Sequence, residues 1–146
     1  MDSVRQLLRT KGNSVWTISP NSTVYQALEL MAEKDIGAVV VTKDGEVLGM
    51  FSERDYARKV ILQGKSSIHT TVGELMVTQV YYVSPENTIE DCMGLMTEKH
   101  VRHLPVIMDK ELIGLVSIGD VVNQVIKHQK FKIRELEKYI TGGYRL

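Results

Sequence analysis

The chain has 146 residues, of which 43% are hydrophobic and 25% charged, and its 18 basic side chains balance its 18 acidic ones. This length suits one compact domain, or two closely packed halves, whose core needs neither metal nor disulfide. The zero net charge disfavours binding to nucleic acid or to a membrane surface through bulk charge. The single cysteine, Cys92, excludes an internal disulfide. Because no apolar run could span a bilayer and no signal-peptide pattern is present, we expect a cytoplasmic protein.

Most of the sequence is a repeat. Residues 19–61 align without a gap with residues 84–126, at an offset of 65, and 15 of the 43 paired positions are identical. An ungapped match of this length indicates an internal duplication.

Each unit is predicted to have the order strand, helix, strand, strand, helix. A short strand, VWTIS or VYYVS, precedes Ser-Pro, and the helix that follows has apolar residues at helical spacing. Thr23 with Gln26, and Thr88 with Asp91, predict capping boxes at the start of these helices. Two strands follow, joined by a turn at KDGE or MDKE, and the second helix begins directly after them.

Outside the units the sequence predicts further helices. SVRQLLR near the N-terminus is helical in pattern, and Thr71 with Glu74 predicts another capping box between the units. Gly142 and Gly143 are expected to end a C-terminal helix. We therefore divide the chain into an N-terminal helix (1–14), unit one (15–65), a linker (66–79), unit two (80–128) and a helical tail (129–146).

The pattern Gly-x-x-Ser-x-x-Asp recurs at the end of each unit's last strand. A helix N-terminus attracts anions, a serine there adds a hydroxyl, and an aspartate three residues later can accept hydrogen bonds from a ribose diol. The glycine would let the strand backbone approach a ligand closely. The same pattern also fits a capping box with aspartate in place of glutamate, which explains both corners without a ligand. The two corners are Gly49, Ser52 and Asp55, and Gly114, Ser117 and Asp120.

The unit resembles the CBS motif, named for cystathionine β-synthase. The resemblance rests on ISP and VSP at the unit starts, on VRHLPV in unit two and on the two corners, and it covers about residues 15–127. It implies an α+β fold in which two tandem β-α-β-β-α units pack about a pseudo-twofold axis and form two clefts. Such clefts commonly bind adenosine compounds. SERDYARK and LEKYITGG look most like small stand-alone bacterial members, which favours NAD or AMP over ADP, ATP or S-adenosylmethionine.

The resemblance also implies site residues. It assigns ribose and phosphate contacts to Ser52, Asp55, Ser117 and Asp120. It assigns the base to the strand that starts each unit and to the strand after its first helix, which points to Thr17, Ile18, Ala38, Val83 and Pro105.

Basic residues near the corners suggest phosphate binding. Arg54 and Arg58 lie one helical turn apart and could grip a diphosphate, or could form a solvated basic face. Arg102 and His103 lie where members of the family often place residues that contact phosphate.

The two clefts are expected to differ. Unit one has Gly37 and Ala38 in place of Arg102 and His103, and the second corner has Gly119 and Asn123 in place of the two arginines of the first, so it offers no local cation. If the unit-two basic residues reach across the pseudo-twofold axis, the first corner would take NAD, ADP or ATP. The second would take a smaller ligand such as AMP, or stay empty.

Three other residue types invite an interpretation. His100 and His103 are three residues apart, but no third metal ligand is visible, so we expect no metal site. Cys92 falls on an apolar helix stripe and is predicted to be a core residue. Trp16 could stack on a base or pack at a strand edge.

No catalytic motif is present in the sequence, so an enzyme is not expected. We expect a regulatory, homodimeric module that binds an adenine nucleotide and signals energy or redox state to an unidentified effector protein, with no nucleic-acid or membrane partner. The alternative is a structural dimerisation or protein-interaction module with degenerate clefts. A third interpretation is a hydrolase that acts on nucleotides.

Overall fold

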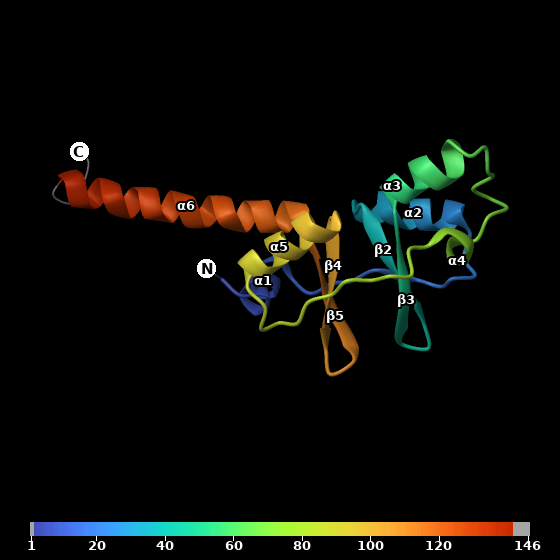
Figure 1. The fold of residues 1–146 in the computed structure, drawn as a ribbon, viewed down its shortest axis with the longest axis horizontal. Helices are drawn as coiled ribbons and strands as arrows, with labels where there is room; N and C mark the ends of the chain where they lie inside the picture. Colours follow the sequence, from blue (N-terminus) through green and yellow to red (C-terminus); the bar gives the residue numbers. More distant parts are fainter. Residues whose placement is uncertain (1, 142–146) are drawn as a thin grey trace.

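The computed structural model describes residues 2–141, apart from the side chains of residues 139–141. Figure 1 shows two similar halves whose β-hairpins lie side by side, and a last helix that projects from the body. The elements in chain order are α1 (Val4–Lys11), β1 (Thr17–Ile18), α2 (Val24–Lys34), β2 (Ala38–Lys43), β3 (Glu46–Ser52), α3 (Glu53–Tyr56), the π-helical turn η1 (Ala57–Ile61), α4 (Val72–Leu75), α5 (Ile89–Lys99), β4 (His103–Met108), β5 (Glu111–Ser117) and α6 (Ile118–Thr141).

The two hairpins have the same pairing and the same irregularity. β2 pairs antiparallel with β3, and β4 with β5, in matching registers. The register shifts after Val41 in the first hairpin and after Val106 in the second, which are equivalent positions at the offset of 65. The α+β fold and its duplication, both predicted, are confirmed.

The strand that starts each unit is shorter than predicted. β1 has two residues and pairs in parallel with β2, while in unit two only a single bridge forms, between Val83 and Val106. The difference has a local cause. In unit one the Val40 N–H donates to the Trp16 carbonyl, but the equivalent residue in unit two is Pro105, which has no N–H to donate. The prediction of a strand over VYYVS in unit two is therefore wrong, because only one residue of this segment, Val83, forms a β-bridge.

The predicted helix starts are confirmed. Thr23, Thr71 and Thr88 each close a capping box with the residue three positions later. Ser3 closes another at the start of α1. The C-terminal helix reaches Thr141, and the predicted stop at Gly142 and Gly143 lies outside the described residues.

Each half has its own core, and α1 belongs to the core of unit two. Val4, Leu7 and Leu8 are buried in the cluster that contains Ile89 and Leu104. Unit one has a separate cluster, to which the short helix α4 contributes through the fully buried Val72. Thus the helix that precedes unit one in the chain packs on unit two, and the helix that precedes unit two packs on unit one.

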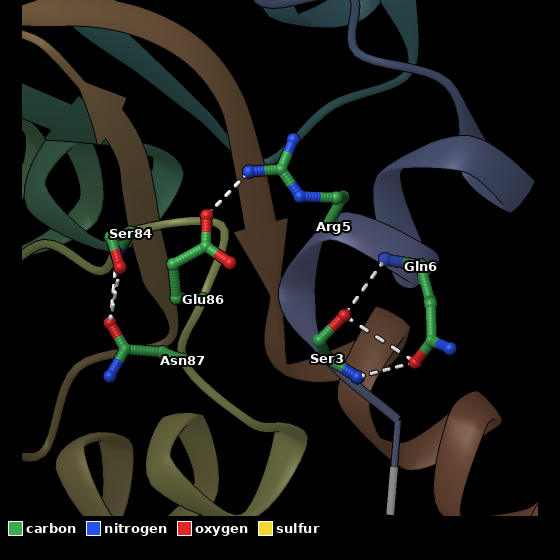
Figure 2. A network of polar contacts seen from close by, with 6 residues as sticks. All are labelled: Ser3, Arg5, Gln6, Ser84, Glu86 and Asn87. Carbon is green, nitrogen blue, oxygen red and sulfur yellow. Dashed lines mark hydrogen bonds and ion pairs between the residues drawn. The ribbon is translucent and has the colours of Figure 1, made fainter.

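The two exchanged helices are held by equivalent hydrogen bonds. The Val4 N–H donates to Asn87 O at 2.8 Å and the Val72 N–H donates to Ser22 O, also at 2.8 Å. Figure 2 shows the surroundings of the first of these bonds, where Arg5 forms an ion pair with Glu86. No helix among residues 2–141 is long and apolar enough to cross a membrane.

The corner glycines make room for this exchange. A Cβ on Gly49 would lie 2.6 Å from Val77 O, and a Cβ on Gly114 would lie 2.8 Å from a methyl group of Leu8. The space beside Gly49 is thus filled by the residues that directly follow α4, and the space beside Gly114 by α1. The expectation that these glycines admit a ligand is wrong.

We predict that Gly49→Ala lowers the free energy of unfolding by about 1–3 kcal/mol, because the new methyl group overlaps a backbone carbonyl that cannot rotate away. The matched control is Gly94→Ala in α5, where a Cβ would meet nothing within 4 Å. That change should stabilise the protein by about 0.5–1 kcal/mol, since alanine favours a helix interior. Urea unfolding of both variants measures the difference, and equal stabilities would contradict the packing described here.

Candidate functional site

The first corner joins β3 to α3 through reciprocal hydrogen bonds. Ser52 Oγ accepts from the Asp55 N–H at 3.1 Å, while Asp55 Oδ2 accepts from the Ser52 N–H at 3.0 Å and from Ser52 Oγ at 2.9 Å. Lys59 Nζ lies 3.6 Å from the other carboxylate oxygen. The capping interpretation is therefore confirmed as a description of the local structure, and both side chains are only partly buried.

The second corner repeats this arrangement and adds a cation. The Ser117 N–H donates to Asp120 Oδ2 at 2.9 Å, and the Asp120 N–H donates to Ser117 Oγ at 3.1 Å. Lys11, in the last turn of α1, donates from Nζ to Asp120 Oδ2 at 2.7 Å and to Leu115 O at 2.6 Å. The corner's own helix offers no cation, as expected, but the exchanged helix α1 supplies one from a distant part of the chain.

A cleft of about 390 Å³ opens between the two units at the first corner. Its volume lies within the usual range for sites that bind small molecules. Unit one, the segment before unit two and the loop before β4 all contribute to its walls. The lining residues are Met50, Ser52, Arg54, Asp55, Arg58, Val77, Gln79, Val80, Tyr81, His100, Val101, Arg102 and His103.

The cleft brings basic groups of both units together. Arg54 and Arg58 line it from unit one, and Arg102 and His103 line it from unit two, as expected if the second pair reaches across. The lining holds three arginines and one carboxylate, that of Asp55. The cleft is therefore suited to an anion, although binding itself stays a prediction.

The residues expected to hold a base lie outside this lining. Ala38, Val83 and Pro105 are buried, while Thr17 is exposed and Ile18 is partly buried. The apolar walls come from segments that were not singled out in the sequence, chiefly Val80, Tyr81 and Val101. The pattern could have indicated Tyr81, since it pairs with Trp16 at the repeat offset.

The aromatic residues that pair at this offset have equivalent neighbours. Lys34 Nζ lies 4.3 Å from the centre of the Trp16 ring, and Lys99 Nζ lies 5.3 Å from that of Tyr81. Trp16 is 39% exposed and therefore lies at a strand edge rather than in the core. A cation over a ring is attracted by its π-electrons.

One acidic and one basic side chain near the second corner, Asp120 and His103, have shifted pKa values. Partial burial opposes ionisation of Asp120, but hydrogen bonds from Lys11 and Ser117 outweigh this and lower the pKa of its carboxyl. Burial lowers the pKa of His103, and the charges of Lys11 and Arg102 lower it further, against the opposing effect of Asp120. At neutral pH the His103 side chain is therefore a neutral part of the cleft wall.

Cys92 is buried in the core of unit two, as predicted, and burial raises the pKa of its thiol to about 11. The thiol is therefore protonated and unreactive at neutral pH. Within the described residues, no group of three or more His, Cys, Asp or Glu side chains could hold a metal ion.

Comparison with known proteins identifies the fold. The family model for the CBS domain matches twice, over residues 4–61 and 72–127. The chain belongs to the CBS-domain family. The predicted division at residues 1–14, 15–65, 66–79, 80–128 and 129–146 remains a proposal.

Relatives of the CBS chain cover most of its length. A mitochondrial CBS domain-containing protein of Arabidopsis thaliana, CBSX3, is 41% identical over 97% of this chain and 73% of its own. The solved structure of a proposed signal-transduction protein with CBS domains from Burkholderia ambifaria MC40-6 is 47% identical, with a TM-score of 0.84, over 88% of this chain and 96% of that one. The solved structure of a hexameric CBS-CP12 protein from bloom-forming cyanobacteria is 27% identical, with a TM-score of 0.74, and the match covers 84% of this chain and 70% of that one. Stand-alone proteins with paired CBS domains are generally non-catalytic regulatory modules that oligomerise and commonly bind adenosine ligands.

We predict that acidification destabilises the protein through His103. Its folded-state pKa lies below the unfolded value of 6.5, so the unfolded chain takes up the proton first and the free energy of unfolding falls as the pH drops from 7. The contribution is at most about 1.4 kcal/mol per pH unit. His103→Asn should lose less stability between pH 7 and pH 5.5 than the wild type in urea unfolding, whereas the control His128→Asn should behave like the wild type. An unchanged pH dependence in His103→Asn would contradict this assignment.

Proposed function

We propose that this CBS pair is a regulatory module that binds adenine nucleotides in the cleft at the first corner. The observation that carries the proposal is the composition of that cleft, in which a serine and an aspartate lie beside arginines from both units. The partly buried carboxylate of Asp55 suits the hydroxyl groups of a ribose, and the arginines suit phosphates. Tyr81, Val80 and Val101 offer apolar surface for a base.

The charge of the cleft favours a ligand with more than one phosphate. Three arginines line it, Arg54 and Arg58 from unit one and Arg102 from unit two. Arginine binds phosphate oxygens with paired N–H donors. We therefore favour NAD, ADP or ATP in this cleft, with AMP as a weaker ligand there; S-adenosylmethionine lacks the phosphates that the arginines would hold.

Binding in this cleft would couple the two units. A nucleotide that contacts both Asp55 and Arg102 stabilises the arrangement in which these residues lie close together. An effector protein that distinguishes this arrangement from others would be sensitive to ligand concentration, because a ligand shifts an equilibrium by its difference in affinity for the two states. The module would then signal energy or redox state without catalysing a reaction, in the cytoplasm as the sequence predicts.

We predict that Arg54→Gln/Arg58→Gln weakens NAD binding about tenfold or more and AMP binding less, because each charged hydrogen bond contributes about 1.5–3 kcal/mol. Isothermal calorimetry with each ligand measures both affinities. The control Lys132→Gln/Arg134→Gln removes the same charge from the exposed part of α6 and should leave both unchanged.

An equal loss for the two ligands, or no loss, would mean that these arginines form a solvated helix face. If neither nucleotide binds the wild type at millimolar concentration, the nucleotide proposal is wrong. The alternative, a structural dimerisation module with degenerate clefts, would then be favoured.

We also propose that the chain forms a homodimer through α6. This helix projects from the body (Figure 1). Its exposed apolar side chains include Phe131, Ile133 and Leu136. An apolar groove of about 330 Å³ lies between α5 and α6, and the exposed Ile118 and Val122 are part of its lining. Ile126, Ile133 and Leu136 follow the spacing of a heptad seam.

We predict that light scattering at micromolar concentration gives twice the chain mass of 16.5 kDa. Ile133→Asp/Leu136→Asp should shift the protein toward the monomer, because charges in an apolar interface are costly. The control Lys127→Asp/Arg134→Asp changes exposed b positions of the same heptads, which point away from the seam, and should keep the wild-type mass. A monomeric wild type would contradict the proposal.

A further inference from the structure

We propose that α6 pairs in parallel with α6 of a second copy of this chain, and that Gln129 sets this direction. The inference rests on the homodimer proposed above and adds to it the relative orientation of the two chains. Unit two of each copy would then lie beside unit two of the other, and both helices would project from the same end of the dimer (Figure 1).

Four exposed apolar side chains of α6 form one seam along the helix. They occupy a and d positions of a single heptad register: Val122, Ile126, Ile133 and Leu136. The core of unit two lies on a different side of the helix, since Val121, at a c position, is buried. Val122 and Ile126 also line the apolar groove between α5 and α6. A partner on the seam would therefore cover the groove as well.

One polar side chain interrupts this seam. Gln129 occupies the d position between Val122 and Leu136, and it is exposed in the single chain. In a parallel pair that is in register, Gln129 faces Gln129 of the second copy, so each amide can donate a hydrogen bond to the other. A polar residue within a coiled-coil seam specifies the arrangement in which its hydrogen bonds are satisfied, at some cost in stability.

An antiparallel pair would be opposed by two effects. Each projecting helix end could cover the groove of the other copy if Leu136 lay opposite Ile126. The same register places Gln129 opposite Ile133, which offers no hydrogen bond, and a buried amide without a partner is costly. It also brings Lys132 close to Lys132 of the second copy, where the two like charges repel each other.

In the parallel pair the charges beside the seam are complementary. Lys132 occupies a g position and Glu137 the e position five residues later, and both side chains are exposed. Parallel coils bring a g residue close to this e residue of the partner, so Lys132 of each copy would lie beside Glu137 of the other. The apolar residues agree with this arrangement, because isoleucine at a with leucine at d favours a two-stranded parallel coil.

Disulfide trapping tests the direction. Mild oxidation should link Gln129→Cys chains at least about tenfold faster than chains of the control Lys127→Cys, because facing seam positions of a parallel pair are within reach of a disulfide and b positions are not. Cys92 does not interfere, since it is buried and its thiol is protonated at neutral pH. The antiparallel pair would instead link Lys130→Cys chains, whose e positions approach each other there, and would leave Gln129→Cys unlinked.

A charge exchange gives an independent measurement of the same direction. Lys132→Glu should weaken the dimer about tenfold, because two attractive pairs are replaced by two repulsive ones. In a parallel pair, Lys132→Glu/Glu137→Lys should restore the wild-type dissociation constant, since the same contacts form with their charges exchanged. In the antiparallel pair the second change would restore nothing, because residue 132 would face its own counterpart.

The possible results separate this inference from the proposed dimer. Linking of Gln129→Cys that is faster than that of both other cysteine variants, together with rescue by the double charge exchange, supports the parallel pair. Faster linking of Lys130→Cys, or the absence of rescue, would overturn the direction and leave a dimer of twice the chain mass. A dimer in which none of the three variants is linked would contradict the role of α6, and a monomeric wild type would contradict the proposed dimer itself.

Discussion

Both strand-to-helix corners depend on reciprocal hydrogen bonds between a serine and the aspartate three residues later. These bonds satisfy backbone N–H groups that a helix start would otherwise leave unpaired, and so they fix where α3 and α6 begin. The direction of α3, and of the η1 turn that continues it, follows from this start; Arg54 on α3 and Arg58 on η1 both line the cleft. A capping interaction and a binding site are therefore not competing explanations here, because the cap positions the groups that would bind.

The exchange of α1 and α4 makes the two corners unequal. The same hydrogen bonds hold both helices, but α4 ends at Leu75 and is followed by extended chain, whereas α1 continues to Lys11. The longer helix carries a lysine to the second corner, and the shorter one leaves room for Gln79 and Val80 in the wall of the first cleft. A duplicated fold thus acquires two corners with different neighbours from one difference in helix length.

The sequence predicted what local patterns control. The duplication, the helix starts and the two hairpins follow from residue spacing and capping chemistry, and the structure agrees with them. The sequence did not predict the contacts between segments that are far apart in the chain. The helices α1 and α4 correspond at a different offset from the rest of the repeat, with Val4 equivalent to Val72. The alignment at 65 residues therefore did not reveal that these helices are exchanged, or that Lys11 lies at the second corner. The sequence could have predicted that no regular strand forms at Val83, because Pro105 has no N–H to donate to it.

The central claim is that the cleft between the units holds an adenine nucleotide, and protein purified rapidly without added ligand tests it most directly. Such a protein can be denatured and the released small molecules identified by mass spectrometry. The account predicts a molecule that contains adenosine and at least one phosphate, at up to one or two per chain, and a marked loss of it in Arg54→Gln/Arg58→Gln. Release of a ligand without a ribose, or retention of the same nucleotide in equal amount by that variant, would contradict it.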